Sequence, residues 1–491
     1  MTLSDDLFHF DNTYARLPER FYQRVHPTPV KSPELVLFNS ELALELGLSH
    51  LAANRGAKIF SGNEIPPGAE PIALAYAGHQ FGNFVPQLGD GRAVLLGEVK
   101  SRNQVRLDIQ LKGSGPTKFS RRGDGRAALG PAIREFILSE AMAALGVPTT
   151  RSLAVVTTGE VVYREQALPG AVVTRVSRSH VRVGTFEYFA ALQDREGLRI
   201  LADYVIDRHF PELSETDGRY LALYQRVVSA QAKLIAQWAQ VGFIHGVMNT
   251  DNMAVSGETI DYGPCAFLDE YAADTVFSSI DQYGRYAFGN QSKIAQWNLQ
   301  SLGACLSPLY SSSAQEAGDI INREIESFHE QFERHWSEGI AQKLGISKYV
   351  LDDRRLIDDL LELMQRGRAD YTLSFRYLSG CDQQSRAAFV ELFSEREGLE
   401  PWLAAWRKRL EEDERPLQEV ARSMRAVNPL FIPRNHRVEQ AINAAVVDGD
   451  FSQARRLNEV LKKPFVDQPE NHELAIPPKP EERVTQTFCG T

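Results

Sequence analysis

The sequence has 491 residues, which exceeds a single hydrophobic core and indicates two or three structural units. Its composition, with 43% hydrophobic and 24% charged residues, is typical of a folded globular protein. Acidic residues outnumber basic ones by 64 to 54, so the net charge of −10 argues against broad binding to nucleic acid or to anionic membranes. No apolar run reaches about 18 residues, the length that a membrane-spanning helix needs. These numbers leave room for a local basic pocket that binds one phosphorylated ligand.

Cysteine usage and the first residues of the chain favour a reducing compartment. The four cysteines show neither metal-ligand spacing nor a disulfide framework, and they are Cys265, Cys305, Cys381 and Cys489. Residues 1–6 are polar and acidic, and they lack the apolar or arginine-rich stretch of a targeting segment. We therefore expect a cytoplasmic protein with no nucleic-acid partner and no membrane partner.

The first part of the chain predicts a small strand-rich unit. Residues 1–70 mix short helical patterns with proline-rich turns, and we expect them to form an N-terminal extension packed on the rest. From 71 to 184 short apolar runs alternate with glycine-rich turns, which is typical of strands. A helix is expected from Pro131 to Leu145, since proline suits a first turn and Gly146 follows its end. The expected strands are 93–99, 105–112, 152–163 and 171–176.

The second part of the chain predicts a larger helical unit over residues 185–466. Residues 221–241 place their apolar side chains on one helical face. Further helices are expected near 315–343, 351–366, 387–395, 402–412 and 436–444. Residues 467–491 are rich in proline and glutamate and predict an extended C-terminal tail that carries Cys489. The fold class is thus α+β, with a strand-rich N-lobe and a helical C-lobe.

Two glycine loops in the N-lobe are candidates for a phosphate site. Gly89 and Gly91 precede a strand together with Arg92, and their lack of side chains lets backbone amides approach an anion. A plain hairpin turn is an equally good interpretation of this loop alone. A second loop contains Asp124 and Gly125 beside Lys118, Arg121 and Arg122. Two such loops with clustered positive charge in an acidic chain favour a phosphate site.

Lys112 ends the second predicted strand and is a candidate phosphate-binding lysine. In protein kinases a strand lysine pairs with a helical glutamate and contacts ATP phosphates. Glu135 and Glu140 both lie on the predicted helix, and their spacing does not decide between them. A solvated lysine at a strand edge is the alternative interpretation.

The segment 245–263 carries the most specific pattern. His245, Asn252 and Asp261 match the histidine, asparagine and second aspartate of the kinase motifs, in which the last two residues hold metal. Val247 occupies the position of the kinase base, and valine cannot accept a proton. Asp251 is the nearest carboxylate that could act instead. Each residue alone also suits a helix cap or turn, but the combination favours a metal site.

Two arginines lie where a kinase places the strand that binds adenine. Arg175 and Arg182 are poor partners for adenine but suit phosphates. If ATP lay reversed in the cleft, its γ-phosphate would meet these arginines and its α-phosphate would lie near the metal. AMP would then be transferred and pyrophosphate would leave. By spacing alone, surface arginines are an equally good interpretation.

With these motifs the sequence resembles the selenoprotein O family of pseudokinase-fold protein adenylyltransferases, in a cysteine-containing bacterial form. The resemblance covers nearly the whole chain. It is carried by Tyr76–Gly82, Gln87–Arg92, Lys112–Arg126, Arg134–Phe136, Gly184–Glu187, His245–Asn252, Ile260–Pro264 and Trp297–Leu299. It implies a two-lobed protein-kinase-like fold and transfer of AMP from ATP to serine, threonine or tyrosine hydroxyls of proteins, the chain itself included. Manganese-dependent transfer of UMP is also implied.

The resemblance also implies roles for individual residues. Asp251 would be the general base, Glu135 the ion-pair partner of Lys112, and Asn252 and Asp261 the ligands of Mg²⁺ or Mn²⁺. Nucleotide contacts would be made by Gly89, Gly91, Arg92, Lys112, Asp124, Gly125, Arg175, Arg182 and Asp261.

Cys489 stands where the family carries selenocysteine or cysteine. Some members pair that residue with a cysteine in the activation-loop region, but residues 275–279 contain none here. The redox switch of those members is therefore not expected in this chain unless Cys265 or another partner substitutes.

Two alternatives to adenylyl transfer follow from the same residues. The first is a kinase-type phosphotransferase that uses Asp251 as its base, and Val247 argues against it. The second is an inactive nucleotide-binding scaffold. The complete set of Lys112, Asp251, Asn252 and Asp261 argues against a scaffold, which has no need of a metal site.

Overall fold

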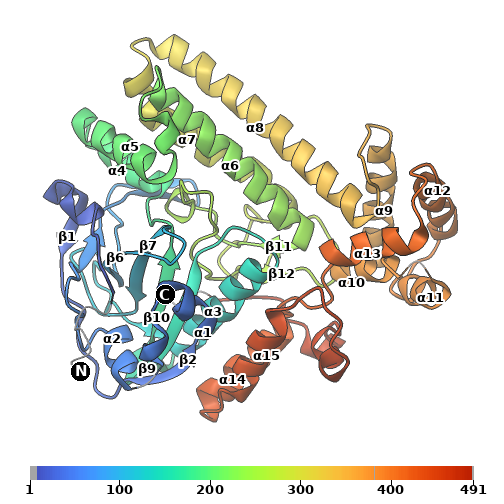
Figure 1. The fold of residues 1–491 in the computed structure, drawn as a ribbon, viewed down its shortest axis with the longest axis horizontal. Helices are drawn as coiled ribbons and strands as arrows, with labels where there is room; N and C mark the ends of the chain where they lie inside the picture. Colours follow the sequence, from blue (N-terminus) through green and yellow to red (C-terminus); the bar gives the residue numbers. More distant parts are fainter. Residues whose placement is uncertain (1–7, 53, 381, 489–491) are drawn as a thin grey trace.

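The computed structural model describes residues 8–52, 54–380 and 382–488. Cys489, expected in the C-terminal tail, lies outside the described residues, as does Cys381. A strand-rich N-terminal region is followed by a helical C-terminal region (Figure 1), so the expected mixture of strands and helices and their order along the chain are confirmed.

One antiparallel sheet dominates the N-terminal region. Its strand order is β1-β3-β6-β7-β10-β9-β2, and β8 (Ala127–Ala128) pairs with β10. The strands of the main path are β1 (Tyr22–Arg24), β2 (Glu34–Phe38), β3 (Ile72–Leu74), β6 (Ala93–Lys100), β7 (Arg106–Lys112), β9 (Arg151–Tyr163) and β10 (Ala167–Ser177). All four strands expected from the sequence are present. The stretch expected to be an N-terminal extension supplies β1 and β2, the two edges of the sheet, and is thus part of it.

The register of the central strands brings two cations to one face of the sheet. Val173 of β10 lies opposite Lys112 of β7, and Arg175 lies opposite Gln110. Directly opposed residues of an antiparallel pair share a face, and so do residues two apart on one strand. Lys112 and Arg175 therefore project from the same face, next to each other.

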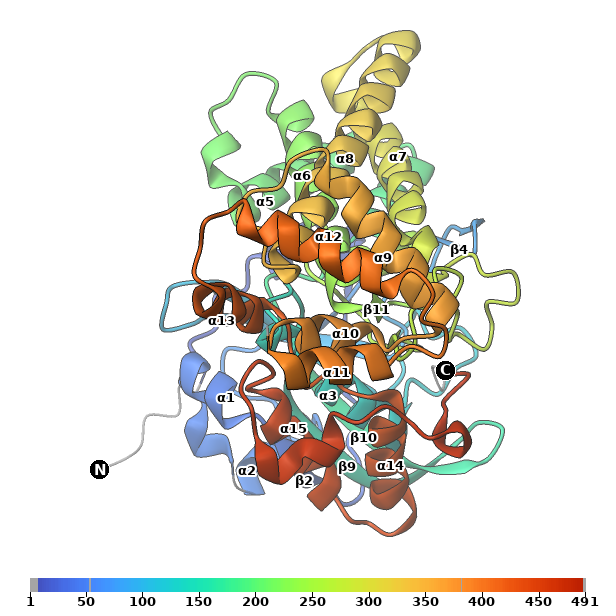
Figure 2. The same ribbon diagram turned by 90° about the vertical axis from the view of Figure 1, so that its right-hand side faces the viewer.

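Helix α3 (Leu129–Ala144) covers that face, packing on β9 and β10. Its outer side is in turn covered by α14 (Asn435–Val447) and α15 (Ser452–Leu461), which return from the end of the chain, as Figure 2 shows. Arg134 of α3 forms an ion pair with Glu439 of α14, and Arg455 of α15 donates to the carbonyl of Val36 at 3.0 Å. Because α3 is enclosed on both sides, even its charged residues are buried.

The helical region begins with a bundle that carries the main core. It comprises α4 (Val183–Ala191), α5 (Arg195–His209), α6 (Arg219–Val241), α7 (Gln291–Tyr310) and α8 (Ala314–Lys343). α6 matches the expected helix at 221–241, and α7 and α8 pack against it. A short ribbon of β11 (Phe243–Ile244) and β12 (Ala266–Phe267) follows α6 and frames the segment between them.

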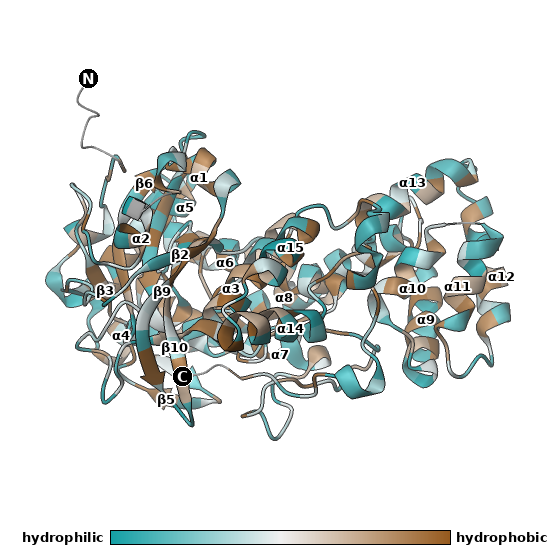
Figure 3. Cartoon of the chain, turned by 90° about the horizontal axis from the view of Figure 1, so that it is seen from below, coloured by the Kyte–Doolittle hydropathy of each residue, from teal (hydrophilic) through white to brown (hydrophobic). Residues whose placement is uncertain are grey.

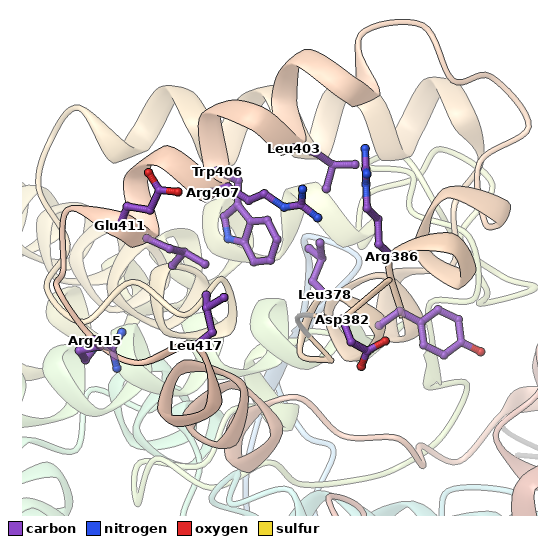
Figure 4. Close-up of a pocket in the computed structure, with 11 residues that line it drawn as sticks. Leu378, Asp382, Arg386, Leu403, Trp406, Arg407, Glu411, Arg415 and Leu417 are labelled. Atoms are coloured by element: carbon purple, nitrogen blue, oxygen red, sulfur yellow. The ribbon is translucent and has the colours of Figure 1, made fainter. Parts of the chain in front are cut away.

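A second helical cluster with a core of its own lies at the end remote from the sheet (Figure 1). Its helices are α9 (Asp353–Gly367), α10 (Tyr371–Leu378), α11 (Gln383–Glu391), α12 (Leu399–Glu411) and α13 (Leu417–Val427). The helix expected at 387–395 begins earlier, because the Asp382 side chain accepts from the amide of Ser385 and caps it. A cavity of about 320 Å³ lies in this cluster. Figure 4 shows side chains that line it, among them Leu403 and Trp406 of α12.

Figure 3 shows hydrophobic and hydrophilic residues interspersed on the strands of the sheet and on the remote helices, as expected where each element buries one face. No helix in the described parts of the chain combines the length and apolarity that a bilayer crossing requires. The cytoplasmic location expected from the sequence stays a prediction.

The described part of the C-terminal tail is extended and returns to the segment that follows the β11–β12 ribbon. It contains two short 3₁₀ turns, Pro469–Leu474 and Pro480–Glu482. Thr487 pairs with Ser278: its amide donates to Phe277 O at 2.7 Å and its hydroxyl donates to Pro264 O at 2.6 Å.

Candidate active site

A cavity of about 840 Å³ lies between the sheet, the two glycine loops and the segment between β11 and β12. This is enough for a nucleotide, since small-molecule sites typically have roughly 300–1,000 Å³. The residues expected at the site come together here although they span 173 positions of the sequence, from 89 to 261. The lining includes Gly89, Gly91, Arg92, Lys112, Asp124, Gly125, Arg175, Arg182, Asp251, Asn252 and Asp261. Glu135 lies directly behind Lys112.

Four charged side chains form a closed cluster in the wall of the cavity. Lys112 Nζ lies 2.7 Å from Glu135 Oε2 and 2.7 Å from Asp261 Oδ1. Arg175 forms an ion pair with Glu135 through Nε and lies 2.5 Å from Asp261 through Nη2. Two cations and two anions thus balance, which lets the charges be buried together. Asp261 thus forms ion pairs with both cations, Lys112 and Arg175.

Electrostatics keeps both acids of this cluster ionised. Burial alone would raise the pKa of Glu135, but the charges of Arg175 and Lys112 outweigh it and hold the pKa below its ordinary value. The same balance applies to Asp261: burial would raise its pKa, but Lys112 and Arg175 hold it well below its ordinary value. Asp261 is therefore a carboxylate at neutral pH, the form that binds a cation.

Glu140, the other candidate on α3, has a structural role. Its Oε1 accepts from Arg151 Nε and from the amide of Ser152, both at 2.9 Å. It also accepts from Asn39 Nδ2 at 2.5 Å. Glu140 thus joins α3 to the start of β9, and the partner of Lys112 is Glu135.

Arg182 extends the positive charge of the cavity. It is the N-cap of α4, and its guanidinium lies 4.2 Å from the ring centroid of Tyr76. Asp90 is the nearest carboxylate at 3.6 Å, longer than a hydrogen bond, and Nε has no partner among the described residues. A buried guanidinium with unused donors suits an anionic ligand.

Asp251 lies in a short 3₁₀ turn (Thr250–Asn252) between β11 and β12. Its residue is 9% exposed, and its Oδ1 has no hydrogen-bond partner in the part of the chain that the structure describes. Burial raises the pKa of this carboxyl to about 7, and the charge of Arg182 opposes the rise. A carboxyl with a pKa near neutrality and a free oxygen can accept a proton from a ligand.

The β4–β5 hairpin, β4 (Gly78–Gln80) and β5 (Asn83–Val85), packs against this turn. The amide of His79 donates to Thr250 Oγ1 at 2.7 Å, and that of Phe81 donates to Asn249 Oδ1 at 3.0 Å. Glu187 of α4 completes the support: it accepts from Thr250 Oγ1 at 2.6 Å and lies 2.8 Å from His79 Nδ1. The sequence points to this hairpin only through the family resemblance. The residues that the hairpin bonds to lie more than 100 positions further along the chain, so no local pattern reveals the contact.

The first glycine loop differs from the expected amide cradle. Gly89 has a φ of 67°, and a Cβ there would lie 2.3 Å from Phe119 Cγ. The amides of residues 89–91 all donate to backbone carbonyls of the protein. The packing of segment 117–120 on this loop therefore requires glycine. Gly89, Gly91 and Arg92 line the cavity.

The turn between β9 and β10 holds the second glycine loop in place. Arg164 makes two bonds to Asp124, 2.9 Å to Oδ2 and 3.1 Å to Oδ1, and these bonds hold the pKa of Asp124 below its ordinary value. Gly125 has a φ of 67°, and a Cβ there would lie 2.1 Å from the carbonyl carbon of Gly115. Only glycine fits this position without a backbone change.

Comparison with known proteins identifies the family. The family model described as "Protein adenylyltransferase SelO" matches residues 6–462. This chain belongs to the SelO family. The protein nucleotidyltransferase YdiU of Rhizobium meliloti (strain 1021) is 58% identical over 487 residues, covering 99% of both chains. YdiU of Rhizobium rhizogenes (strain K84 / ATCC BAA-868) is 58% identical over 485 residues, covering 98% of this chain and 97% of the relative. The resemblance noted in the sequence is thereby confirmed.

A metal ion in this SelO chain would draw ligands from both protein and nucleotide. Among the described residues no three His, Cys, Asp or Glu side chains gather as a metal site. Asp261 and Asn252 line one cavity, and Asn252 Nδ2 donates to Val247 O at 3.0 Å, which fixes its amide. Mg²⁺ commonly takes one or two protein oxygens and completes its shell with phosphates and water. The donor set therefore fits a nucleotide-bound Mg²⁺ or Mn²⁺.

Proposed function

We propose that this chain transfers AMP from ATP to serine, threonine or tyrosine hydroxyls of proteins, itself included, and releases pyrophosphate. The observation that carries the proposal is the placement of two buried arginines, Arg175 and Arg182, in the same cavity as the buried carboxyl of Asp251. Arginines suit the β- and γ-phosphates, and Asp251 suits the incoming hydroxyl. The α-phosphate then lies between them, where transfer of AMP takes place.

The reaction needs one proton transfer and one displacement at phosphorus. The Asp251 carboxylate accepts the proton of the acceptor hydroxyl, and the hydroxyl oxygen attacks the α-phosphorus. The bond from the α-phosphorus to its bridging oxygen breaks, and pyrophosphate leaves with the charge that Lys112, Arg175 and Arg182 balance. Asn252 and Asp261 would hold Mg²⁺ or Mn²⁺, which supplies further positive charge to the phosphates. Transfer of UMP from UTP with Mn²⁺ is part of the proposal.

We further infer a protein-kinase-like arrangement. A strand lysine (Lys112) paired with a helical glutamate (Glu135), next to a sheet, corresponds to the kinase lysine–glutamate pair. The β11–β12 segment, placed after the long helix α6, corresponds to the kinase catalytic and metal loops. Val247 lines the cavity at the position of the kinase base and offers no proton acceptor. This supports adenylyl transfer over the phosphotransferase alternative.

The test is intact-protein mass spectrometry after incubation with ATP and Mg²⁺ or Mn²⁺, with and without added bacterial proteins. We expect the wild-type chain or an added protein to gain the mass of one AMP unit. The isosteric variant Asp251→Asn should bind ATP yet add no AMP, since the amide cannot accept the proton. A gain of a phosphoryl unit would overturn the proposal in favour of a kinase. Absence of any nucleotide-dependent gain on either protein would favour the scaffold alternative.

A further inference from the structure

One aromatic side chain at the cavity has no part in the protein's own packing. Tyr163, the last residue of β9, lines the cavity while 76% of its surface is exposed. Exposing a large aromatic ring forgoes the free energy of burying it. No ring or cation in the described part of the chain stacks on Tyr163. The ring is available to a ligand.

The other aromatic residues that line the cavity are already used. Tyr76 lies beneath the guanidinium of Arg182, with 4.2 Å between the guanidinium carbon and the ring centroid. Phe81 contacts the ring of Tyr286 at 5.0 Å, and Phe119 is buried beside the first glycine loop. Tyr163 is thus the aromatic lining residue that can offer its face to a flat ligand group.

The position of Tyr163 is fixed relative to the second glycine loop. Its neighbour Arg164 makes two bonds to Asp124, at 2.9 and 3.1 Å, and donates to Arg126 O at 2.9 Å. Arg126 in turn forms an ion pair with Glu160 of β9 at 3.4 Å. The backbone that carries Tyr163 is therefore held at the rim of the cavity, and its exposed ring extends from there.

The charges of the cavity orient a nucleotide toward this ring. Lys112, Arg175 and Arg182 are buried and suit the phosphates, which form one end of ATP. In contrast, Arg121 and Arg122 of the second glycine loop line the same cavity but are exposed to solvent. The β4–β5 hairpin and the Asp251 turn occupy another side of the cavity, where the acceptor hydroxyl must enter. The base is at the opposite end of ATP from the phosphates. We therefore expect it on the side of the cavity formed by the second glycine loop and Tyr163.

We propose that Tyr163 stacks on the base of the bound nucleotide and favours purine over pyrimidine nucleotides. This inference rests on the proposed function, because it takes the phosphate end of the site as given. Stacking on an aromatic side chain accepts any base but is stronger for the larger purine ring. ATP would then bind more tightly than UTP because adenine has the larger stacking area. The preference would not depend on hydrogen bonds to the base.

The test is calorimetric titration of the full chain, with Mg²⁺ present, using three probes: ATP, UTP and inorganic tripolyphosphate. Tyr163→Ala should lower ATP affinity about tenfold, lower UTP affinity less, and leave tripolyphosphate affinity unchanged. Tyr163→Phe keeps the ring and should match the wild type. Val161→Ala is the matched control, because Val161 is 54% exposed on the same strand and does not line the cavity.

The outcomes separate this inference from the proposed function. Unchanged ATP affinity in Tyr163→Ala would overturn the stacking contact while leaving the phosphate site intact. An equal loss for ATP and tripolyphosphate would also overturn it, because the substitution would then act on the phosphate end. If the wild type bound no tripolyphosphate, the phosphate site itself would be wrong, and the proposed function would fail with it.

Discussion

Asp251 has a buried carboxyl, and one of its oxygens has no hydrogen-bond partner among the described residues. Burial raises the pKa of this carboxyl to about 7, so near neutrality it exchanges between acid and base forms. Only the carboxylate can accept a proton from a hydroxyl. Below about pH 7 the rate of AMP transfer should therefore fall about tenfold per pH unit, and above it the rate should level.

The same pKa shift has a cost in stability that a substitution can reveal. The folded-state pKa of Asp251 is raised, so its contribution to stability is greatest below the unfolded value and is lost as pH rises toward about 7. Asp251→Asn removes this loss. Relative to wild type, the variant should gain stability between about pH 4 and about pH 7, on the order of 1 kcal/mol per pH unit. Urea unfolding of both proteins at several pH values measures this.

A control of opposite sign is available in the same cavity. The pKa of Asp124 is lowered by Arg164, so the ionised form supports the fold above its unfolded value and the support is lost as pH falls. Asp124→Asn should therefore lose stability relative to wild type as pH rises toward the ordinary value of 3.8, and the loss should then stay constant up to neutrality. Parallel pH curves for wild type and Asp251→Asn would contradict the raised pKa of Asp251.

At the residue level, the sequence predicted which side chains lie together, and their roles stay predictions. The motifs named Lys112, Arg175 and Asp261, and the structure places them in one cavity. Periodicity could not choose between Glu135 and Glu140, because α3 is enclosed by the sheet on one side and by two C-terminal helices on the other. A helix buried all round has no polar face for the pattern to reveal.

At the level of elements, the β4–β5 hairpin sets the position of the turn that carries Asp251. A Cβ on Gly78 would lie 2.6 Å from Asp251 Oδ1 and 3.0 Å from its Cβ. Gly78→Ala should therefore displace the Asp251 carboxyl while the backbone of the hairpin keeps its conformation. We expect the rate of AMP transfer to fall about 100-fold, the cost of misplacing a reacting group by about 1 Å.

The control for this prediction comes from the same hairpin. Asn83 is exposed in β5, and Asn83→Ala should leave the rate close to wild type. Thermal unfolding should show both variants folded, which separates displacement of Asp251 from loss of structure. Wild-type turnover by Gly78→Ala would mean that the hairpin does not position the carboxyl.

The elements that the sequence predicted are the long and regular ones. Strands β6, β7, β9 and β10 and helices α3, α6 and α8 are long enough for apolar runs, periodicity or end signals to identify them, and each lies close to its predicted range. Strands β1 and β2 have three and five residues, too few for a pattern. They also pair with strands far along the chain, and such pairing is set by the sheet rather than by local sequence.

At the scale of the whole molecule, the C-terminal part of the chain holds distant regions together. α14 and α15 cover α3, and the tail pairs with the segment that follows β12. Arg434, just before α14, is fully buried where these parts meet. It makes two bonds to Asp370, 2.6 and 3.0 Å, one to Asp269 at 3.0 Å and one to Ala475 O at 3.2 Å.

Substituting Arg434 therefore tests how much these contacts contribute to the free energy of unfolding. Arg434→Met keeps much of the side-chain volume but leaves Asp269 and Asp370 buried without their cation. Breaking a buried ion pair in this way typically costs about 3–5 kcal/mol, and we expect a loss of this size in urea unfolding at neutral pH. The loss should shrink as pH falls, because Asp269, whose pKa is already raised by burial, can then take up a proton in the folded state and bury no charge.

The matched control is Arg483→Met in the tail, whose ion pair with Glu270 is partly exposed on both sides. Exposed pairs contribute about 0–1 kcal/mol, so this variant should unfold close to wild type. A double variant, Arg434→Met with Asp370→Asn, should recover part of the stability, because one buried charge is gone and asparagine can still cap α10. Equal unfolding curves for Arg434→Met and Arg483→Met would show that the buried guanidinium does not hold the parts together.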